Sequence, residues 1–250
     1  MNEIMNFTGK KYIVTGASSG IGKEICKKLS QLGATIILVA RDETRLKECM
    51  SQLEGENHKY YIFDLSRVEG IEGLVKDIVE ENGKIDGFVH SAGVGPTRPL
   101  KNTKFEFAME VFKINTFAFL ELLRVFSLKK YNTGSGAVVG ISSAQSVFPT
   151  KGVTVYSASK AGMDAIIKVA AKELSDKNIR VNNVQPAWVK TKIMTEYLEN
   201  ADSNSSQTQS VVKNALETSE VAAAVAFLLS DASSGINGRS ILMGQVENDY

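Results

Sequence analysis

Cysteine and histidine are both scarce in this chain of 250 residues. The two cysteines, Cys26 and Cys49, are far apart in the sequence and each falls in a helix-like stretch, so neither a disulfide framework nor a thiolate metal site is expected. The two histidines, His58 and His90, are too few to build a zinc site of imidazole ligands. We therefore expect a metal-free protein, and a reducing cytoplasm is its simplest setting.

Long apolar runs and an excess of one charge are also lacking. The longest uninterrupted apolar run, residues 221–229, is far shorter than the roughly 20 residues that cross a bilayer. The first residues, MNEIMNFTGKK, contain no apolar core followed by a small-residue cleavage site, so export is not expected. Twenty-nine Lys and Arg against twenty-eight Asp and Glu leave a net charge of +1. This balance predicts neither a nucleic-acid partner nor an anionic membrane partner.

The residues that are present alternate between short apolar runs and longer helix-like segments. The apolar runs are nearly continuous, which is typical of strands covered on both faces. They span residues 11–15, 35–40, 59–63, 85–89, 137–141 and 179–184. The helix-like segments span residues 21–32, 43–53, 68–82, 104–130, 155–176 and 218–230. This alternation predicts one α/β domain over residues 1–250, a doubly wound parallel sheet of about seven strands with helices on both faces.

One segment departs from this alternation. Residues 199–210 (ENADSNSSQTQS) are polar, rich in Ser, Asn and Gln, and without helical or strand period, which predicts a surface loop. The loop follows the last turn of the expected site, so a mobile substrate lid is favoured over an unimportant excursion. We expect the lid to span residues 190–214.

A glycine-rich turn directly follows the first expected strand. Residues 15–22 read TGASSGIG, and an amphipathic helix follows them. Glycines at this spacing let the backbone turn tightly and approach a pyrophosphate, while a helix N-terminus offers free N–H groups to the anion. A plain connecting turn is the alternative, but the position in the first strand–helix unit favours a dinucleotide site. The residues expected to bind the cofactor here are Gly16, Ser18, Ser19, Gly20, Ile21 and Gly22.

This TGxxxGxG turn resembles that of the short-chain dehydrogenase/reductase family, and the resemblance continues over almost the whole chain. It implies a Rossmann-type fold and an NAD(P)-dependent oxidoreductase that acts on CH–OH groups. The general pattern is most similar to that of 3-oxoacyl-carrier-protein reductases. That subgroup shares its core motifs with reductases of many other carbonyls, so the resemblance leaves the substrate open.

The end of the second strand bears on the choice of coenzyme. In the family an acidic residue at this position usually selects NAD(H), whereas here Ala40 is followed by Arg41. A neutral residue does not repel a 2′-phosphate, and a guanidinium can pair with it bidentately. NADP(H) is therefore the preferred cofactor. NAD(H) stays possible, because Asp42 lies beside Arg41 and Arg41 can also be read as a solvated residue.

Further segments match the family's coenzyme site. Asp64 matches an acidic residue near the adenine, although it is also suited to cap the next helix. Residues 90–93 read HSAG where the family usually carries NNAG, so the small profile is kept and both asparagines are absent. The turn after the sixth strand resembles the family's Pro-Gly turn under the nicotinamide. The resemblance thus adds Asp64, Leu65, Ser91, Ala92, Gly93, Pro186, Val189 and Thr191 to the expected cofactor-binding residues.

Tyr156 and Lys160 stand four residues apart at the start of an expected helix, which places them on one face. An ammonium nearby stabilises a phenolate, so we expect Lys160, together with the positive nicotinamide of the oxidised coenzyme, to lower the pKa of Tyr156 from about 10 toward working pH. The resemblance adds Ser143, thirteen residues before Tyr156, as the group that polarises the substrate carbonyl, and Asn115 as the anchor of a water linked to the lysine. It makes Tyr156 the proton donor of a reversible hydride transfer and gives both Tyr156 and Lys160 contacts with the coenzyme.

The sequence says least about the substrate. We expect Gln145, Phe148 and Trp188 to line its site, a mixture that is aromatic and apolar with few charges. The expected reaction reduces a small-molecule ketone, aldehyde or 3-oxoacyl thioester to an alcohol. A catalytically weak NAD(P)-binding sensor or scaffold is the alternative, suggested by the HSAG segment and by Met243-Gly244-Gln245 where many members have Asp-Gly-Gly.

The two longest helix-like segments, residues 104–130 and 155–176, carry more apolar residues than one sheet can cover. A deeply buried helix is one explanation. In related proteins these helices pair between subunits, so we expect a homodimer or homotetramer with two-fold symmetry.

Overall fold

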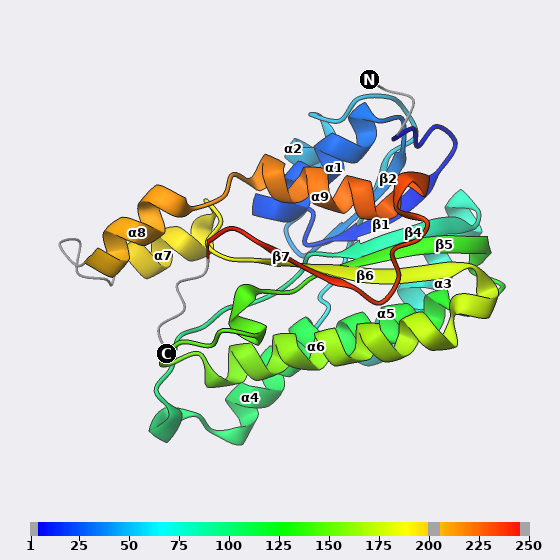
Figure 1. Cartoon of the computed structure of the whole chain (residues 1–250). Helices are drawn as coiled ribbons and strands as arrows, with labels where there is room; N and C mark the ends of the chain where they lie inside the picture. The colour runs from blue at the N-terminus through cyan, green and yellow to red at the C-terminus, as the bar shows by residue number, and fades with distance from the viewer. Residues whose placement is uncertain (1–4, 200–205, 246–250) are drawn as a thin grey trace.

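A sheet of parallel strands runs through the centre of the protein (Figure 1). The structure, a computed structural model, describes residues 5–199 and 206–245. Within these residues the sheet has seven strands in the order β3-β2-β1-β4-β5-β6-β7, and the order reverses between β1 and β4. The strands are β1 (Lys11–Thr15), β2 (Thr35–Ala40), β3 (Lys59–Ile62), β4 (Ile85–His90), β5 (Asn132–Ile141), β6 (Ile179–Pro186) and β7 (Ser240–Met243). The predicted doubly wound fold is confirmed.

A layer of helices covers each face of the sheet (Figure 1). One layer contains α1 (Gly20–Gln31), α2 (Glu43–Met50) and α9 (Thr218–Leu229). The other contains α3 (Ile71–Asn82), α4 (Phe105–Phe112), α5 (Ala118–Phe126) and α6 (Thr154–Glu173). The remaining helices, α7 (Lys192–Glu199) and α8 (Ser206–Asn214), lie beyond one end of the sheet, at the left of the view. No helix in the described ranges is long and apolar enough to cross a membrane.

Strand side chains alternate between two apolar cores, one under each helical layer. In β1, Val14 packs with residues of α1 and α9, whereas Ile13 packs with residues of α3 and α5. Leu38 and Ile37 repeat this division in β2. Successive side chains on a strand point to opposite faces, and both faces are covered here. The sequence therefore shows unbroken apolar runs instead of an alternation of apolar and polar residues.

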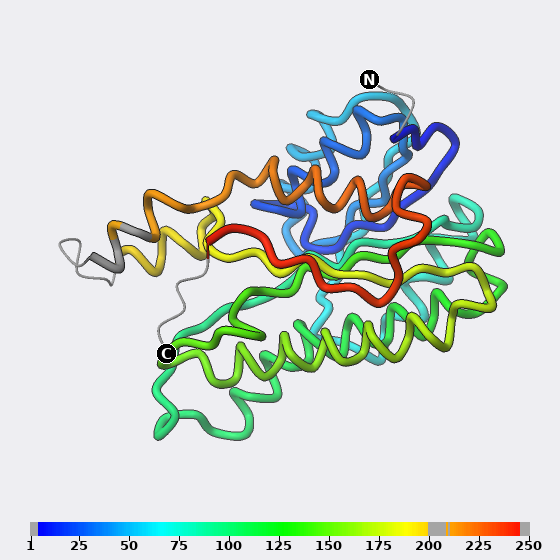
Figure 2. Tube along the Cα trace, in the orientation of Figure 1, coloured from blue at the N-terminus to red at the C-terminus, as the bar shows by residue number. Residues whose placement is uncertain are grey.

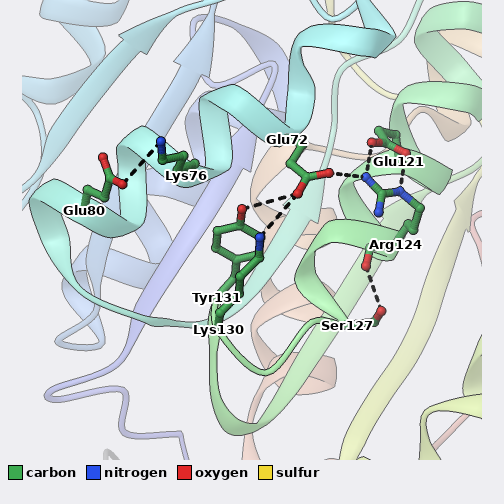
Figure 3. Close-up of polar contacts among 8 residues, drawn as sticks. All are labelled: Glu72, Lys76, Glu80, Glu121, Arg124, Ser127, Lys130 and Tyr131. Carbon is green, nitrogen blue, oxygen red and sulfur yellow. Dashed lines mark hydrogen bonds and ion pairs between the residues drawn. The ribbon is translucent and has the colours of Figure 1, made fainter.

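A polar cluster joins α3 to α5 on the surface of one layer (Figure 3). The Arg124 guanidinium lies 2.6 Å from one Glu72 oxygen and 2.7 Å from Glu121. The other Glu72 oxygen lies 3.5 Å from both Lys130 Nζ and the Tyr131 hydroxyl, just before β5. The charged side chains are partly exposed, so water screens the ion pairs and each pair adds little to stability. The cluster lies outside the groove described below.

Two strands differ from the prediction. β5 begins at Asn132, five residues before the expected start, because the polar NTGSG segment pairs with β4 at Ile85 through a register shift. β7, which the sequence did not locate, pairs Met243 with Pro186 at the edge of the sheet; Figure 2 shows it in red beside the yellow β6. Ile241 and Leu242 of β7 are partly exposed, so this edge strand lacks the continuous burial of the inner ones.

Two helical predictions need correction. The expected helix over residues 104–130 is divided by a π turn, Lys113–Phe117, and ends at Phe126. The expected loop over residues 199–210 is wrong in part, because residues 206–210 belong to α8 and Glu199 closes α7; residues 200–205 lie outside the described residues. The sequence of α8 is polar enough to hide its helical period, although Val211 is buried.

The two cysteines are distant in sequence but adjacent in the core. Cys26 on α1 and Cys49 on α2 are both buried free thiols. Burial, together with the neighbouring thiol of Cys49, raises the pKa of Cys26. The pair thus joins the helix after the glycine turn to the helix after β2.

Candidate active site

A groove of about 560 Å³ lies at the carboxyl ends of β1 to β4, where the strand order reverses. Such a reversal leaves a crevice in doubly wound sheets, because the connections on its two sides run to opposite faces. The groove is lined by Gly16, Ser18, Ser19, Ala40, Arg41, Asp42, Arg45, Phe63, Asp64, Leu65, Ala92, Gly93, Val94 and Ile114. Its place and its glycine-rich wall fit an extended dinucleotide.

The glycine turn forms a cradle that larger residues would fill. Gly16 has φ +66°, and a Cβ there would lie 2.8 Å from the Ala92 nitrogen. A Cβ at Gly22 would overlap the carbonyl oxygen of Gly16. Ser19, which caps α1, makes no side-chain hydrogen bond to the helix, so the first turn of α1 is not closed by its own cap. These residues therefore fit a pyrophosphate bound at the N-terminus of α1.

Charged residues gather where the groove passes β2 and β3. Asp42 caps α2 by accepting the backbone N–H of Arg45 at 3.0 Å, and it also lies 3.4 Å from the Arg45 guanidinium. In the described part of the chain, Arg41 has no hydrogen-bond or ion-pair partner. Asp64 accepts the backbone N–H of Ser66 at 2.9 Å, and this bond, aided by the charge of Arg41, holds the pKa of Asp64 below its usual value. Asp64 thus closes a local turn and does not cap α3.

The structure brings many of the predicted cofactor residues to this groove. Those that line it are Gly16, Ser18, Ser19, Arg41, Asp64, Leu65, Ala92 and Gly93. Thr191 lies near the same turn, with its methyl carbon 3.4 Å from where a Cβ of Gly20 would stand. Pro186 ends β6, and Val189 is buried and bridged to Leu216, both outside the groove lining.

Sequence reasoning missed several lining residues. These are Arg45, Phe63, Val94 and Ile114, whereas Ala40 and Asp42 were already considered for the choice of coenzyme. Most of them adjoin a predicted residue, so their position at the carboxyl end of a strand could have identified them as lining residues. Ile114 was beyond reach, because only the π turn and the fold bring it to the end of β4.

Ser143 and Tyr156 meet at the start of α6. Ser143 follows β5 and caps a short 3-10 turn by accepting the backbone N–H of Gln145 at 3.1 Å. Its hydroxyl is also close enough to Tyr156 to lower the pKa of the phenol. Ser142 lies on the other side, where its hydroxyl is 3.5 Å from the carbonyl oxygen of Lys160. Ser143, not Ser142, therefore faces the tyrosine.

The protein groups alone set the following electrostatics, and the lowered pKa expected for Tyr156 beside bound coenzyme stays a prediction. Burial raises the pKa of Tyr156, and the nearby Ser143 hydroxyl only partly opposes this. Lys160 Nζ donates to the Ile141 carbonyl at 2.7 Å and lies 6.0 Å from the centre of the tyrosine ring. Burial itself lowers the pKa of Lys160 to about 8, against the opposing charge of Asp164. Among the protein groups, Tyr156 is thus held protonated at neutral pH.

Asn115 joins the loop after β4 to α6. Its π turn is closed by the Ala118 N–H bonded to the Lys113 carbonyl. The Asn115 side chain accepts the Val94 N–H at 2.9 Å, donates to the Val94 carbonyl at 3.0 Å and donates to Ser159 Oγ at 2.9 Å. These three hydrogen bonds occupy the side-chain amide of Asn115. The water that we expect Asn115 to bind stays a prediction.

Gly93 connects the groove with the catalytic set. It lines the groove, and a Cβ at this position would lie 3.3 Å from Lys160 Nζ and 3.3 Å from Asn115 Oδ1. A glycine here leaves the lysine amine close to the groove wall. The structure thus brings the predicted catalytic residues to the edge of the predicted coenzyme site.

The expected substrate residues fall in two places. Gln145 and Phe148 follow Ser143 in one turn, where Gln145 Oε1 accepts the Thr150 N–H at 2.8 Å. Trp188 stacks on Tyr197 of α7, with ring centroids 4.4 Å apart. Trp188 therefore contacts α7, and its place in the substrate site stays a prediction.

Known proteins resemble the chain over nearly its full length. A family model described as enoyl-(acyl carrier protein) reductase matches residues 16–244. A 3-oxoacyl-acyl-carrier-protein reductase from Thermotoga maritima is 32% identical over 242 residues, covering 95% of this chain and 97% of that protein. An L-xylulose reductase from Caenorhabditis elegans is 31% identical over 239 residues, covering 94% of each. The solved L-sorbose reductase from Gluconobacter frateurii, complexed with NADPH and L-sorbose, has a TM-score of 0.87 at 25% identity and covers 96% of this chain and 97% of its own.

The chain belongs to the short-chain dehydrogenase/reductase family. The predicted family and the enzyme class, an oxidoreductase of CH–OH or carbonyl groups, are confirmed. One structural neighbour holds NADPH, and another, a xylitol dehydrogenase, holds NAD⁺ with a TM-score of 0.86 at 25% identity and 95% coverage of this chain and 98% of its own. A nicotinamide coenzyme is thus common to these neighbours.

Proposed function

We propose that the protein is an NADP(H)-dependent reductase that converts a ketone, aldehyde or 3-oxoacyl thioester to an alcohol, with Tyr156 as proton donor. The observation that carries this proposal is the contact of Ser143 with Tyr156 beside a glycine-rich groove. Lys160 and Asn115 complete the set at the groove wall, next to Gly93. A serine and a tyrosine hydroxyl side by side form a site for one carbonyl oxygen.

The mechanism uses the hydroxyl groups at the end of β5 and the start of α6. When bound, the reduced coenzyme supplies a hydride to the carbonyl carbon. Ser143 donates a hydrogen bond to the carbonyl oxygen, and Tyr156 gives that oxygen its proton as negative charge develops. Because burial raises the pKa of Tyr156, its proton is present at neutral pH, as reduction requires. Lys160 Nζ would hold the ribose, since it lies close to Gly93.

The preference for NADP(H) rests on the end of β2. Ala40 and Arg41 both line the groove, so a 2′-phosphate placed there meets a neutral residue and a guanidinium. Arg45 lines the same wall but is paired with Asp42, whereas Arg41 makes no such pair within the described residues. Arg41 is therefore the phosphate ligand we propose, and NAD(H) remains the weaker alternative.

The proposed substrate is an uncharged carbonyl compound approached through an apolar entrance. Val147 and Ile193 are both about half exposed, beside the turn of Ser143 and at the start of α7. A Cβ at Gly95 would lie 3.6 Å from the Tyr156 ring and 3.7 Å from Ile193, so α7 begins beside the tyrosine. This proximity supports the proposal that residues 190–214 act as a lid. Sorbose and xylulose reductases among the similar proteins make sugar ketones reasonable candidates beside 3-oxoacyl thioesters.

The proposed assembly is a homodimer or homotetramer in the cytoplasm. Phe105 on α4, Leu120 on α5 and Val169 on α6 are apolar side chains left largely exposed. A second copy of the same surface would bury them, as a two-fold interface requires. Light scattering at micromolar protein concentration tests this, and a monomeric mass would contradict it. The cytoplasmic location stays a prediction from the scarcity of cysteine.

A substrate panel tests the proposed reaction. The purified protein is incubated with NADPH and with ketones, aldehydes, ketoses or acetoacetyl thioesters, and NADPH oxidation is followed by its absorbance. We expect oxidation with at least one class of carbonyl and a lower kcat/KM with NADH. Tight NADPH binding without oxidation on any carbonyl would contradict the proposal and favour a sensor or scaffold.

A further inference from the structure

His90 is a buried polar residue that the mechanism above does not use. It ends β4, in the position where the family usually carries the first Asn of NNAG, and its side chain is fully buried. A buried polar group without partners is costly, so both ring nitrogens need hydrogen bonds. Their partners show what this histidine does.

Each ring nitrogen of His90 contacts a different turn at the site. Nδ1 lies 3.1 Å from Thr15 Oγ1, at the end of β1 immediately before the glycine turn. Nε2 lies 3.0 Å from the carbonyl oxygen of Ile114, in the π turn immediately before Asn115. Thr15 Oγ1 also accepts the backbone N–H of Ala92 at 3.2 Å. One imidazole therefore spans the glycine turn and the turn of the catalytic asparagine.

The partners determine which nitrogen carries the proton. The Ile114 carbonyl only accepts, so Nε2 must be the donor. Burial, with the positive charge of Lys160, lowers the pKa of His90 to about 3, so the ring is neutral and Nδ1 accepts. Thr15 Oγ1 also lies 3.5 Å from the Val89 carbonyl, but Nδ1 is nearer at 3.1 Å, so Thr15 donates its hydroxyl proton to Nδ1 while it accepts from Ala92. The result is a one-directional chain of hydrogen bonds from Ala92 through Thr15 and His90 to Ile114.

We propose that His90 is a positioning residue, which as its neutral Nε2–H tautomer holds the π turn of Asn115 in register with the glycine turn. Asn115 clamps Val94 and bonds Ser159 one residue before Lys160, so a shift of the π turn would move the wall that the lysine faces. The catalytic consequence rests on the proposed function. The tautomer of His90 and its hydrogen bonds to Thr15 and Ile114 do not depend on the proposed function.

Histidine-selective ¹⁵N NMR tests the bridge directly, because the chain has only two histidines. His58→Gln assigns the two sets of signals. We expect His90 to show the neutral Nε2–H pattern unchanged from about pH 8 to about pH 5. An Nδ1–H pattern, or a titration within that range, would overturn the proposal. This measurement uses the folded protein without substrate, so it stands whether or not the proposed reaction is found.

A pair of variants tests the catalytic consequence. His90→Gln keeps an N–H donor at the reach of Nε2, whereas His90→Asn is too short to bond Ile114. We expect His90→Asn to lower kcat about tenfold while the KM for NADPH stays within about threefold, and His90→Gln to restore kcat to within about threefold of the wild type. Equal kcat values for the Asn variant and the wild type, or no recovery in the Gln variant, would overturn the catalytic part.

A matched control separates positioning from general loss of stability. His58 also bonds two backbone groups, the Ile36 N–H at 3.0 Å and the Glu54 carbonyl at 2.9 Å, but lies outside the groove lining. His58→Gln is expected to leave kcat unchanged. If its kcat fell in parallel with that of His90→Asn, the effect would be one of stability and the positioning role would be refuted.

Discussion

The carboxylate of Asp164 accepts the side-chain N–H of Gln185 at 2.7 Å, joining α6 to β6 behind the catalytic residues. Asn183 donates to the other oxygen of the same carboxylate. Gln185 Nε2 also lies 3.0 Å from Ser146 Oγ, and Ser146 donates to the Ser143 carbonyl at 2.8 Å. A buried network thus connects the helix that carries Lys160 with the turn that carries Ser143.

Asp164 is predicted to set the pH range of the enzyme. It lies one helical turn after Lys160 and raises the pKa of that lysine, which burial lowers to about 8. If the ammonium form is needed, activity falls as pH rises through about 8. Asp164→Asn removes the opposing charge, so this fall moves to lower pH. We expect activity at about pH 8, relative to about pH 6, to drop at least about threefold in the variant.

The kcat/KM pH profile measures this shift, with Glu173→Gln as control. Glu173 is an exposed carboxylate on the same helix, so its loss is expected to leave the profile in place. An alkaline limb at the same pH in Asp164→Asn and the wild type would show that Lys160 does not govern it.

Arg41 is predicted to discriminate between the two coenzymes. Arg41→Ala removes the unpaired guanidinium of the groove and should lower kcat/KM for NADPH about 10- to 100-fold, while kcat/KM for NADH changes less than about threefold. Ala40→Asp adds an acidic residue at the end of β2 and should act in the same direction by repulsion. Arg45→Ala, on the same wall but already paired with Asp42, is the matched control with a smaller effect. An unchanged NADPH to NADH ratio in Arg41→Ala would contradict the assignment.

Acid is predicted to unfold the protein through His90. In the unfolded chain histidine binds a proton near pH 6.5, whereas the buried ring of His90 does so only at about pH 3. The unfolded state therefore binds more protons between these values, and stability present above about pH 6.5 is lost as pH falls, by up to ~1.4 kcal/mol per pH unit. Urea unfolding of wild type and His90→Gln at several pH values measures the slope. The same acid dependence in both proteins would contradict the buried neutral imidazole.

The fold was largely predictable because a strand that is buried on both faces of the sheet has a nearly continuous apolar sequence. The runs that became β1 and β2 have apolar centres, and their predicted positions match the observed bounds. β6 was also found at nearly its observed bounds, although it buries the polar side chains of Asn182 and Asn183. The polar start of β5 and the short edge strand β7 lack a continuous apolar run, since their residues are partly exposed. The polar helix α8 was expected as a loop for the same reason.

The site was predictable where motif residues adjoin strand ends and less so where it depends on packing. The glycine turn and the Tyr156–Lys160 pair follow from spacing on known elements. The π turn does not, because the carbonyl of Ile114 bonds to a histidine that lies 24 positions away in the sequence. The raised pKa of Tyr156 in the protein alone could not be predicted from the sequence either, since it results from burial.

The central claim is that the Tyr156 hydroxyl delivers the proton, and turnover of Tyr156→Phe tests it most directly. The variant keeps the ring and loses the proton donor, so we expect kcat to fall about 100- to 10,000-fold with NADPH affinity within about twofold of the wild type. Tyr131→Phe, which loses a hydroxyl near Glu72 outside the groove, should retain full activity. Near-normal turnover by a folded Tyr156→Phe protein would contradict the account.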